Sequence, residues 1–289
     1  MRILITGANG MLAQAVKKKF EKENERILTD AKELDITDLD AVVKKVEELK
    51  PEFIINCAAF TNVDGAEENE ELCKRVNGDG PTNLAIAANK VGASLVHIST
   101  DYVFGGMKPV DEDYKEDDEK APESVYGRTK LAGEEGITKN LENYYIFRTA
   151  WLYGEGKNFV RTMLEVGKTH DEVTVVSDQH GSPTYCEDLT NFIYEAVTKK
   201  IPFGIYNATN DGYTTWFDFT KKIYELAGLK TKVNPTSTEE YMKNAKKPVA
   251  KRPLNSKMSK EKLKSAGIIV PSWEDALTRY LKQEGVINA

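Results

Sequence analysis

The first 100 residues alternate short β-branched runs with longer stretches in which apolar residues recur at helical spacing. The predicted strands are Arg2–Thr6, Ile27–Thr29, Phe53–Ala58 and Ser94–Ser99, and the predicted helices are Met11–Glu23, Leu39–Leu49 and Pro81–Val91. Strands that alternate with helices pair in parallel, because each helix carries the chain back along the sheet. The pattern therefore predicts an α/β fold on a doubly wound parallel sheet of the Rossmann type, with ligands at the carboxyl ends of its strands.

The regular alternation weakens after residue 145. The predicted strands there are Tyr144–Thr149 and Val173–Ser177, and the predicted helices are Leu189–Lys199, Trp216–Leu226 and Glu274–Lys282. We expect a dinucleotide-binding domain over residues 1–150, with segments around 170–210 returning to it. We expect a smaller C-terminal α/β substrate-binding region over residues 151–289. The acidic stretch Asp111–Lys120 is predicted to be an exposed loop near the site.

A glycine-rich turn, Thr6-Gly7-Ala-Asn-Gly10-Met-Leu-Ala13, follows the first predicted strand and opens the first predicted helix. Gly7 and Gly10 allow a tight turn and a close backbone approach, so that a pyrophosphate can rest on the amides at the positive end of the helix. The spacing is Gly-x-x-Gly-x-x-Ala rather than the commoner Gly-x-Gly-x-x-Gly. Its place between strand and helix predicts a dinucleotide site.

Asp30 follows the second predicted strand, twenty residues after Gly10. An acidic side chain at this place accepts hydrogen bonds from the adenosine ribose hydroxyls. A 2′-phosphate would meet like charge there, so the position favours NADH over NADPH. NADPH stays possible, because the positive charge of Lys32 is close enough to offset Asp30.

Tyr126 and Lys130 form a Tyr-x-x-x-Lys pair whose side chains share one face if the segment is helical. A lysine held there favours the phenolate, so the tyrosine could exchange a proton near neutral pH during reduction of a carbonyl. With 13 tyrosines in a lysine-rich chain, chance alone supplies roughly one such pair. The second pair, Tyr153 and Lys157, encloses Gly154 and Gly156, and glycines disfavour the helix that the geometry needs.

Charge and composition exclude several classes of function. Forty Lys and Arg against 46 Asp and Glu give a net charge of −6, without the basic excess of a nucleic-acid-binding protein. No apolar run is long enough for a membrane span, and the start of the chain does not resemble a secretory signal. The cysteines are Cys57, Cys73 and Cys186, and the histidines are His97, His170 and His180. The cysteines have no metal-ligand spacing and the histidines are far apart, so we expect a cytoplasmic protein without a metal site, with ordinary packing or surface roles for the histidines.

The sequence resembles the extended short-chain dehydrogenase/reductases and, within them, the dTDP-4-dehydrorhamnose reductases. The resemblance runs through Gly7–Ala13, Asp35–Asp38, Asn56–Asp64, Val76–Asn77, His97–Gly105, Tyr126–Glu134, Arg148–Gly154, Asp178–Thr184 and Lys251–Pro253. It covers most of the chain. The most specific segments are Ser-Thr-Asp-Tyr-Val-Phe from Ser99 and Arg-Thr-Ala-Trp-Leu-Tyr-Gly from Arg148.

The resemblance implies a role for individual residues. Tyr126 would donate the proton, Lys130 would support it and hold the nicotinamide ribose, and Thr100 would hydrogen-bond the carbonyl, with Ser99 as its backup. The implied cofactor residues are Gly7, Gly10, Met11, Leu12, Asp30, Asp35, Ile36, Ala58, Ala59, Thr61, Asn77, Ser99, Tyr126 and Lys130, of which Asn77 would steady the active-site backbone. The implied substrate residues are Thr100, Asp101, Tyr126, Trp151 and Arg252. Core packing is the alternative for Trp151, and a structural ion pair is the alternative for the candidate diphosphate contacts Arg148 and Arg252.

The implied activity is the NAD(P)H-dependent reduction of the 4-keto group of dTDP-4-dehydro-L-rhamnose, which yields dTDP-L-rhamnose for surface polysaccharide. The expected partner is the nucleotide-sugar substrate, and the expected state is a monomer or homodimer. Some members of the family are described as magnesium-bridged dimers that use a glutamate early in the first helix. Ala15 stands at that place here, which argues against a metal bridge.

Two alternatives remain open. One is a nucleotide-sugar epimerase or dehydratase of the same fold, although Asp101-Tyr102 follows Thr100 where a dehydratase has an Asp-Glu pair. The other is a non-catalytic regulatory subunit, because the methionine adenosyltransferase beta subunit resembles this same family. The presence of Thr100, Tyr126 and Lys130 together favours an enzyme.

Overall fold

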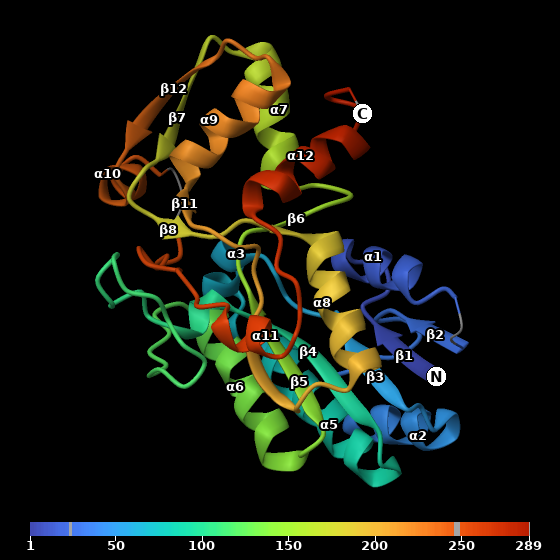
Figure 1. Cartoon of the computed structure of the whole chain (residues 1–289). Helices are drawn as coiled ribbons and strands as arrows, with labels where there is room; N and C mark the ends of the chain where they lie inside the picture. Colours follow the sequence, from blue (N-terminus) through green and yellow to red (C-terminus); the bar gives the residue numbers. More distant parts are fainter. Residues whose placement is uncertain (23–24, 246–248, 289) are drawn as a thin grey trace.

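The computed structural model describes residues 1–22, 25–245 and 249–288. Within this part of the chain, a six-stranded sheet has the order β10-β5-β4-β3-β1-β2, and each neighbouring pair is parallel (Figure 1). The strands are β1 Arg2–Thr6, β2 Glu25–Thr29, β3 Phe53–Asn56, β4 Ser94–Thr100, β5 Tyr144–Thr149 and β10 Gly204–Asn207. The doubly wound parallel sheet predicted from the sequence is confirmed.

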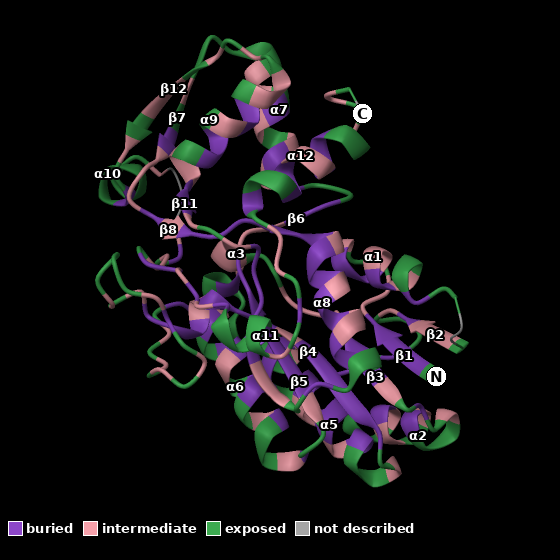
Figure 2. Cartoon of the chain, viewed as in Figure 1, coloured by how far each residue is buried: buried purple, intermediate pink, exposed green. Residues whose placement is uncertain are grey.

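Helices cover both faces of this sheet. On one face, α1 Met11–Lys19 and α8 Cys186–Lys199 lie side by side over a core that includes Val16, Leu189 and Phe192 (Figure 1). On the other face, α2 Leu39–Leu49, α5 Gly80–Val91 and α6 Val125–Asn140 enclose a second core. Figure 2 shows the central strands β1, β3, β4 and β5 as mostly buried between the two layers, whereas the edge strand β2 is only partly buried. Burial on both faces explains why these strands are continuous apolar runs rather than alternating ones.

Local sequence signals set the helix boundaries. The side chain of Asp38 accepts a hydrogen bond from the amide of Ala41 at 3.0 Å and so begins α2, which ends at Lys50 in a left-handed conformation, just before Pro51. Ser124 caps α6 in the same way, accepting from the amide of Gly127 at 3.1 Å. This cap fixes the first turn of α6, which carries Tyr126.

Between β3 and α5 the chain forms three short helical segments: α3 Val63–Glu68, α4 Glu70–Lys74 and the π-helix η1 Arg75–Asp79. A single 3-10 turn, η2 Asp101–Val103, follows β4. Single π turns are often found at functional sites. Both η1 and η2 lie toward the carboxyl ends of the strands, where ligands gather in sheets of this kind.

The C-terminal part of the chain forms a separate layer over those strand ends (Figure 1). Its helices are α7 Phe159–Thr169, α9 Trp216–Ala227, α10 Thr238–Lys243 and α12 Trp273–Gln283, with α11 Glu261–Ser265 beside β10. Its strand pairs are β7 Glu172–Val176 with β12 Lys232–Thr236, β6 Leu152–Tyr153 with β9 Thr184–Tyr185, and β8 His180–Gly181 with β11 Thr214–Thr215. α7, α9 and α12 share an aromatic core that includes Tyr153, Phe219 and Tyr280.

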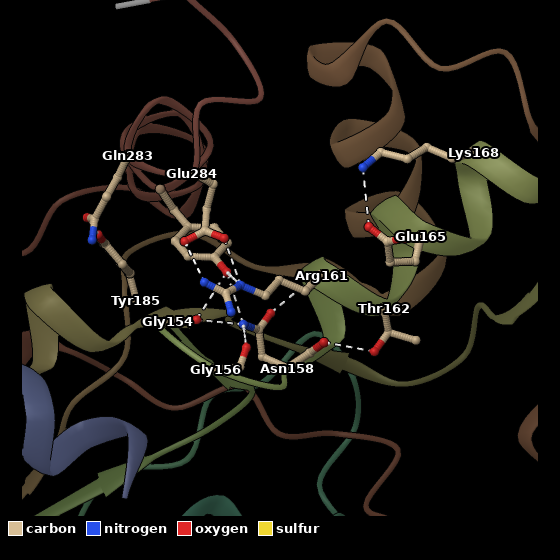
Figure 3. Close-up of polar contacts among 11 residues, drawn as sticks. Gly154, Gly156, Asn158, Arg161, Thr162, Glu165, Lys168, Tyr185, Gln283 and Glu284 are labelled. Carbon is tan, nitrogen blue, oxygen red and sulfur yellow. Dashed lines mark hydrogen bonds and ion pairs between the residues drawn. The ribbon is translucent and has the colours of Figure 1, made fainter. Parts of the chain in front are cut away.

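Polar contacts join α7 to α12 (Figure 3). Arg161 forms a fork with the carboxylate of Glu284 at 2.7 and 2.8 Å. Asn158 caps α7 and donates to the carbonyl of Gly154 at 2.6 Å and to the hydroxyl of Tyr280 at 3.0 Å. These bonds provide a hydrogen-bond partner for the Arg161 amide at the start of α7 and hold this helix against α12 and Glu284.

Several sequence predictions need correction. The first helix ends at Lys19 rather than Glu23, which lies outside the described residues, and β3 ends at Asn56 rather than Ala58. None of the elements predicted from the sequence corresponds to α7, β10 or β12. The stretch Asp111–Lys120 is a loop, but Tyr114 within it is 3% exposed and stacks on Phe104 with ring centroids 4.4 Å apart, so the loop is anchored rather than free. None of the described helices is long and apolar enough to cross a membrane.

Candidate active site

Two cavities lie at the carboxyl ends of the strands. The turn cavity, of about 290 Å³, is lined by Gly7, Asn9, Gly10, Asp30, Asp35, Ile36, Cys57, Ala58 and Ala59 with a few neighbours. The aromatic cavity, of about 340 Å³, is lined by residues that include Asp101, Tyr102, Trp151, Phe159, Trp216 and Arg252. The catalytic candidates Thr100 and Tyr126 lie beside Asp101 and Tyr102 of the aromatic cavity.

The glycine turn closes tightly on the segment after β3. Gly7 has φ +66°, and a Cβ there would lie 2.6 Å from the backbone of Ala58, so a side chain would force the turn and that segment apart. The amide of Gly10 donates to the carbonyl of Gly7 at 2.9 Å, and α1 then begins without a side-chain cap. Uncapped amides beside a glycine cradle are the donor set that a pyrophosphate requires. The turn therefore fits a dinucleotide.

Asp30 lines the turn cavity beside the glycine turn. Its carboxylate accepts from the amide of Lys32 at 2.8 Å and from the side chain of Asn9. Hydrogen bonds involving Glu33 and the Lys32 amide hold the pKa of Asp30 below its usual value, so this group is ionised at neutral pH. Sequence reasoning missed Asn9, whose only signal was its place inside the glycine turn.

Seven predicted cofactor residues do not line the turn cavity, Tyr126 and Lys130 among them. Met11 and Leu12 begin α1 but pack against the core of that face. Thr61 is exposed outside the cavity lining, and the hydroxyl of Ser99 is buried without a hydrogen-bond partner among the described residues. Asn77 clamps the backbone of Phe60, accepting from its amide at 2.8 Å and donating to its carbonyl at 3.0 Å, so it positions the loop after β3.

Thr100, at the end of β4, connects Tyr126 with Asp101. The hydroxyl of Thr100 donates to Oδ1 of Asp101 at 2.8 Å and accepts from the amide of Tyr102 at 3.2 Å. It is also close enough to the Tyr126 hydroxyl to influence the pKa of that tyrosine. Gly127 makes this approach possible, because a Cβ there would lie 2.4 Å from the carbonyl of Tyr102. The predicted catalytic Thr100 and Tyr126 are thus brought side by side.

The predicted electrostatic effect of Lys130 on Tyr126 is not what the structure shows. Burial and the negative charge of Asp101 raise the pKa of Tyr126, and the hydrogen bond with Thr100 lowers it only in part. The Lys130 ammonium is turned away, donating to the carbonyl of Ile98 with His97 as its other polar neighbour. Tyr126 therefore keeps its proton, and a protonated tyrosine is the form that can act as an acid.

Two other groups at the site have displaced pKa values. Lys130 is 2% exposed, and burial lowers its pKa to about 8. Asp101 is equally buried, and burial raises its pKa to about 6 although hydrogen bonds from Ser256 and Thr100 act in the opposite direction. Shifted ionisable groups that converge on a cavity are typical of catalytic sites.

Trp151 and Trp216 form a flat wall of the aromatic cavity. Their rings stack with centroids 3.9 Å apart, and Phe159 packs on Trp216 at 4.4 Å. Trp151 has φ +48°, a strained conformation for a bulky residue, and such strain persists at sites where the surroundings hold it in place. The half-buried Trp151 lines the cavity as well as packing, and the sequence did not point to Trp216 or Phe159.

The two candidate arginines differ. Arg252 lines the aromatic cavity and forms a fork with Asp64 at 3.0 Å for each bond. Arg148 has no exposed surface, and Glu134 binds its guanidinium at 2.9 and 2.6 Å. A diphosphate contact through Arg148 is therefore wrong, and its alternative, a structural ion pair, is what the structure contains.

No cluster of three or more histidine, cysteine or acidic side chains suited to a metal ion occurs in the part of the chain that the structure describes. Cys57 lines the turn cavity, and burial raises the pKa of its thiol to about 12. A thiol with so high a pKa is not a nucleophile at neutral pH. Its contribution to the cavity is therefore its size.

Comparison with known proteins gives matches over nearly the whole chain. A family model described as the RmlD substrate binding domain matches residues 1–286. The spore coat polysaccharide biosynthesis protein SpsK of Bacillus subtilis is 38% identical over 286 residues, covering 98% of this chain and 97% of that protein. A crystal structure of a dTDP-4-dehydrorhamnose reductase from Clostridium acetobutylicum has a TM-score of 0.93 and 44% identity, covering 99% of this chain and all of that one. The dTDP-4-dehydrorhamnose reductase of Bacillus anthracis, in complex with NADP, has a TM-score of 0.91 and 41% identity, covering 98% and 99%.

Proposed function

Because the chain belongs to the RmlD substrate binding domain family, we propose that it reduces the 4-keto group of dTDP-4-dehydro-L-rhamnose to give dTDP-L-rhamnose. Its relatives from Clostridium acetobutylicum and Bacillus anthracis are named for this reaction and align with nearly all of it. The observation that carries the proposal is the contact of protonated Tyr126 with Thr100 beside the aromatic cavity. An acid next to a pocket with flat apolar walls suits a keto sugar attached to a nucleotide.

The turn cavity would hold a nicotinamide cofactor, which supplies the hydride when it is bound. The amides around Gly7 and Gly10 would bind its pyrophosphate, and Asp30 would accept from the adenosine ribose. The ionised Asp30 favours NADH, while Lys32 leaves NADPH possible. The Bacillus anthracis relative is in complex with NADP, which supports a nicotinamide cofactor of either kind.

In the proposed reduction, each residue of the site would have its own role. Tyr126 donates its proton to the 4-oxygen as negative charge grows there, and Thr100 gives that oxygen a second hydrogen bond by turning its hydroxyl away from Asp101. Lys130 would hold the nicotinamide ribose. Trp151 provides a flat surface for the sugar or base, and Arg252 binds the diphosphate.

The two cavities suggest a division of the chain. Residues 1–150, together with α8 and β10, would bind the cofactor, and most of 151–289 would bind the nucleotide sugar. The monomer or homodimer and the cytoplasmic location stay predictions.

Oxidation of NADH and of NADPH, measured against a panel of nucleotide-linked 4-keto-6-deoxy sugars, tests the proposal. We expect one cofactor oxidised per sugar reduced, with dTDP-L-rhamnose identified by NMR. An epimerase or dehydratase would leave the cofactor unchanged over a cycle. A regulatory subunit would oxidise none with any sugar and would bind a partner enzyme instead.

Tyr126→Phe should remove nearly all turnover while cofactor binding persists. Tyr153→Phe is the matched control, because Tyr153 belongs to the second Tyr-x-x-x-Lys pair and lies buried in the C-terminal core. Near-wild-type reduction by the Tyr126 variant would refute its role as the proton donor.

A further inference from the structure

One buried polar side chain of the aromatic cavity has no role in the proposed reduction. Gln179 lies between β7 and β8, lines this cavity and is only 5% exposed. Its amide donates to the hydroxyl of Thr238, the first residue of α10, at 3.0 Å. Among the described residues no group hydrogen-bonds the amide oxygen Oε1, and yet this oxygen is not fully enclosed by protein. Oε1 therefore faces the cavity as an acceptor without a partner.

Thr238 and Asp178 fix which way round the Gln179 amide lies. The Thr238 hydroxyl donates its single hydrogen to Oδ1 of Asp178 at 2.6 Å, and the Thr238 amide donates to both oxygens of that carboxylate at 2.9 Å. The Thr238 hydroxyl can therefore only accept from Gln179, so the NH2 group must face it and Oε1 must face away. Because Thr238 occupies one N–H, the amide keeps one N–H and Oε1 for a ligand.

The walls around this amide suit a flat ring. Phe159, Met163, Val175 and Trp216 line the same cavity, and a few fixed polar groups in an apolar pocket decide the orientation of its ligand. In the proposed function the sugar lies at Thr100 and Tyr126 and the diphosphate at Arg252. The base is the part of the substrate that then remains for the aromatic walls and for Gln179.

An amide held in one orientation distinguishes between pyrimidine bases. Thymine and uracil present an N3–H donor beside a carbonyl acceptor, which matches an amide that offers an acceptor oxygen and an N–H. Cytosine presents the reverse at the same two positions, because its N3 accepts and its amino group donates. A base held in place by its diphosphate therefore gains two hydrogen bonds if it has an imide edge and meets like groups if it is cytosine.

We propose that Gln179 is a specificity-determining residue that pairs with the imide edge of a thymine or uracil base. Thr238 and Asp178 are positioning residues that prevent the Gln179 amide from turning over. This pairing rests on the proposed function for the presence of a nucleotide in the aromatic cavity. It does not depend on which sugar the nucleotide carries or on whether that sugar is reduced.

The first test measures nucleotide binding to the full wild-type chain by isothermal titration calorimetry, with NADPH present and no sugar. Thymidine diphosphate is compared with its 3-methyl analogue, which lacks the imide N–H, and with deoxycytidine diphosphate. We expect each of these two to bind about tenfold more weakly than thymidine diphosphate. Deoxyuridine diphosphate keeps the imide and should bind within about threefold of thymidine diphosphate. Equal affinity for thymidine diphosphate and its 3-methyl analogue would overturn the proposal.

Gln179→Met should weaken binding of thymidine diphosphate about tenfold and remove the preference over the 3-methyl analogue. Gln283→Met is the matched control, because Gln283 accepts from Tyr185 outside the aromatic cavity, and it should leave the affinity unchanged. A preference for the unmethylated base that persists in Gln179→Met would show that the methyl group only clashes, and the proposal would be wrong. An effect of Gln179→Met on sugar-linked nucleotides alone would assign the amide to the sugar instead.

Thr238→Val tests the orientation of the amide separately from its presence. Without the Thr238 hydroxyl the Gln179 amide can turn over and pair with cytosine, so the preference for thymidine over deoxycytidine diphosphate should fall to about threefold or less. An unchanged preference would overturn the positioning role. If Gln179→Met fails to fold, Thr238→Val and the wild-type comparison still decide the question.

The binding measurements separate this proposal from the reduction itself. Discrimination among the four nucleotides by a chain that reduces no keto sugar would defeat the proposed function and support the pairing. Reduction by a chain that binds thymidine diphosphate and its 3-methyl analogue equally would defeat the pairing alone. A wild-type chain that binds none of the nucleotides would overturn both.

Discussion

The hydroxyl of Thr100 donates its hydrogen to Oδ1 of Asp101 over 2.8 Å. Thr100 has one hydroxyl hydrogen, so without substrate it gives that hydrogen to a carboxylate rather than to the site. Ser256 donates to the other oxygen of Asp101, so the carboxylate also ties the loop after α10 to the end of β4. The protonation state of Asp101 therefore affects both the ability of Thr100 to donate a hydrogen bond to a substrate and the stability of the fold.

Asp101→Asn should stabilise the protein in a pH-dependent way. The folded chain holds the pKa of Asp101 at about 6, above the usual 3.8, so it binds a proton between these values while the unfolded chain does not. The ionised form thus costs stability at neutral pH, and this cost falls as the pH drops from about 6 and is gone only below about 3.8. In urea unfolding we expect a gain of about 1–2 kcal/mol at pH 7.5 and little at about pH 3.5. The exposed Asp111→Asn is the control, and equal destabilisation of Asp101→Asn at both pH values would contradict this account.

Arg252→Lys should weaken substrate binding more than catalysis. A lysine cannot form the fork with Asp64, so its charge would no longer be held at the aromatic cavity. We expect KM to rise about tenfold with kcat nearly unchanged, which corresponds to the loss of one charge-assisted hydrogen bond. Lys251→Met, beside it in the chain and paired with Glu123, should leave both constants unchanged. A fall in kcat at constant KM would instead place Arg252 at the reacting carbonyl.

Asp30→Asn should shift cofactor preference toward NADPH. The variant keeps hydrogen-bonding atoms near Asn9 but removes the negative charge that would repel a 2′-phosphate. The ratio of kcat/KM for NADPH to that for NADH should rise by about tenfold, because the variant loses one repulsion between a negative side chain and the 2′-phosphate. Lys32→Met should move the ratio the other way. A shift in the same direction for both variants would show that charge at this position does not decide the preference.

Glu284→Gln should loosen the attachment of α12 to α7 (Figure 3). Glu284 is 18% exposed and forms both bonds of the fork with Arg161, so the free energy of unfolding should fall by about 1–2 kcal/mol. Lys168→Met, which breaks the exposed pair with Glu165 on the same helix, should change it by less than about 0.5 kcal/mol in the same urea titration. Equal effects of the two variants would mean that the fork contributes no more than a surface pair.

Sequence patterns predicted the elements whose signals are local. Three elements have the predicted bounds: Arg2–Thr6, Leu39–Leu49 and Tyr144–Thr149. The signals for a buried strand or a capped amphipathic helix lie within or next to the element itself, so they can be recognised from the sequence. β10 was missed because it has four residues and its partner β5 lies more than fifty residues earlier. α7 was missed although Asn158, its cap, is a typical start signal.

The same distinction holds for the site. The turn at Gly7 and the Tyr126 pair were visible as motifs. The charge environment of Tyr126 depends on Asp101, which follows β4 and which the fold brings close to α6. Arg148 was assigned two possible roles because its partner Glu134 is identified only by tertiary contact. His97 was taken as an ordinary packing residue, since its position next to Lys130 arises only when β4 and α6 come together.

β10 has a consequence for dividing the molecule. It pairs with the outer side of β5 from Gly204 to Asn207, after the chain has left the sheet to form α7 and β7 of the C-terminal layer. A fragment that stops after Thr149 would leave β5 as a bare edge with unpaired amides and carbonyls, ready to join another chain. Exchange of the C-terminal part between relatives by a single crossover would therefore split one sheet between two parents. A successful chimera needs junctions on both sides of the segment that contains α8 and β10.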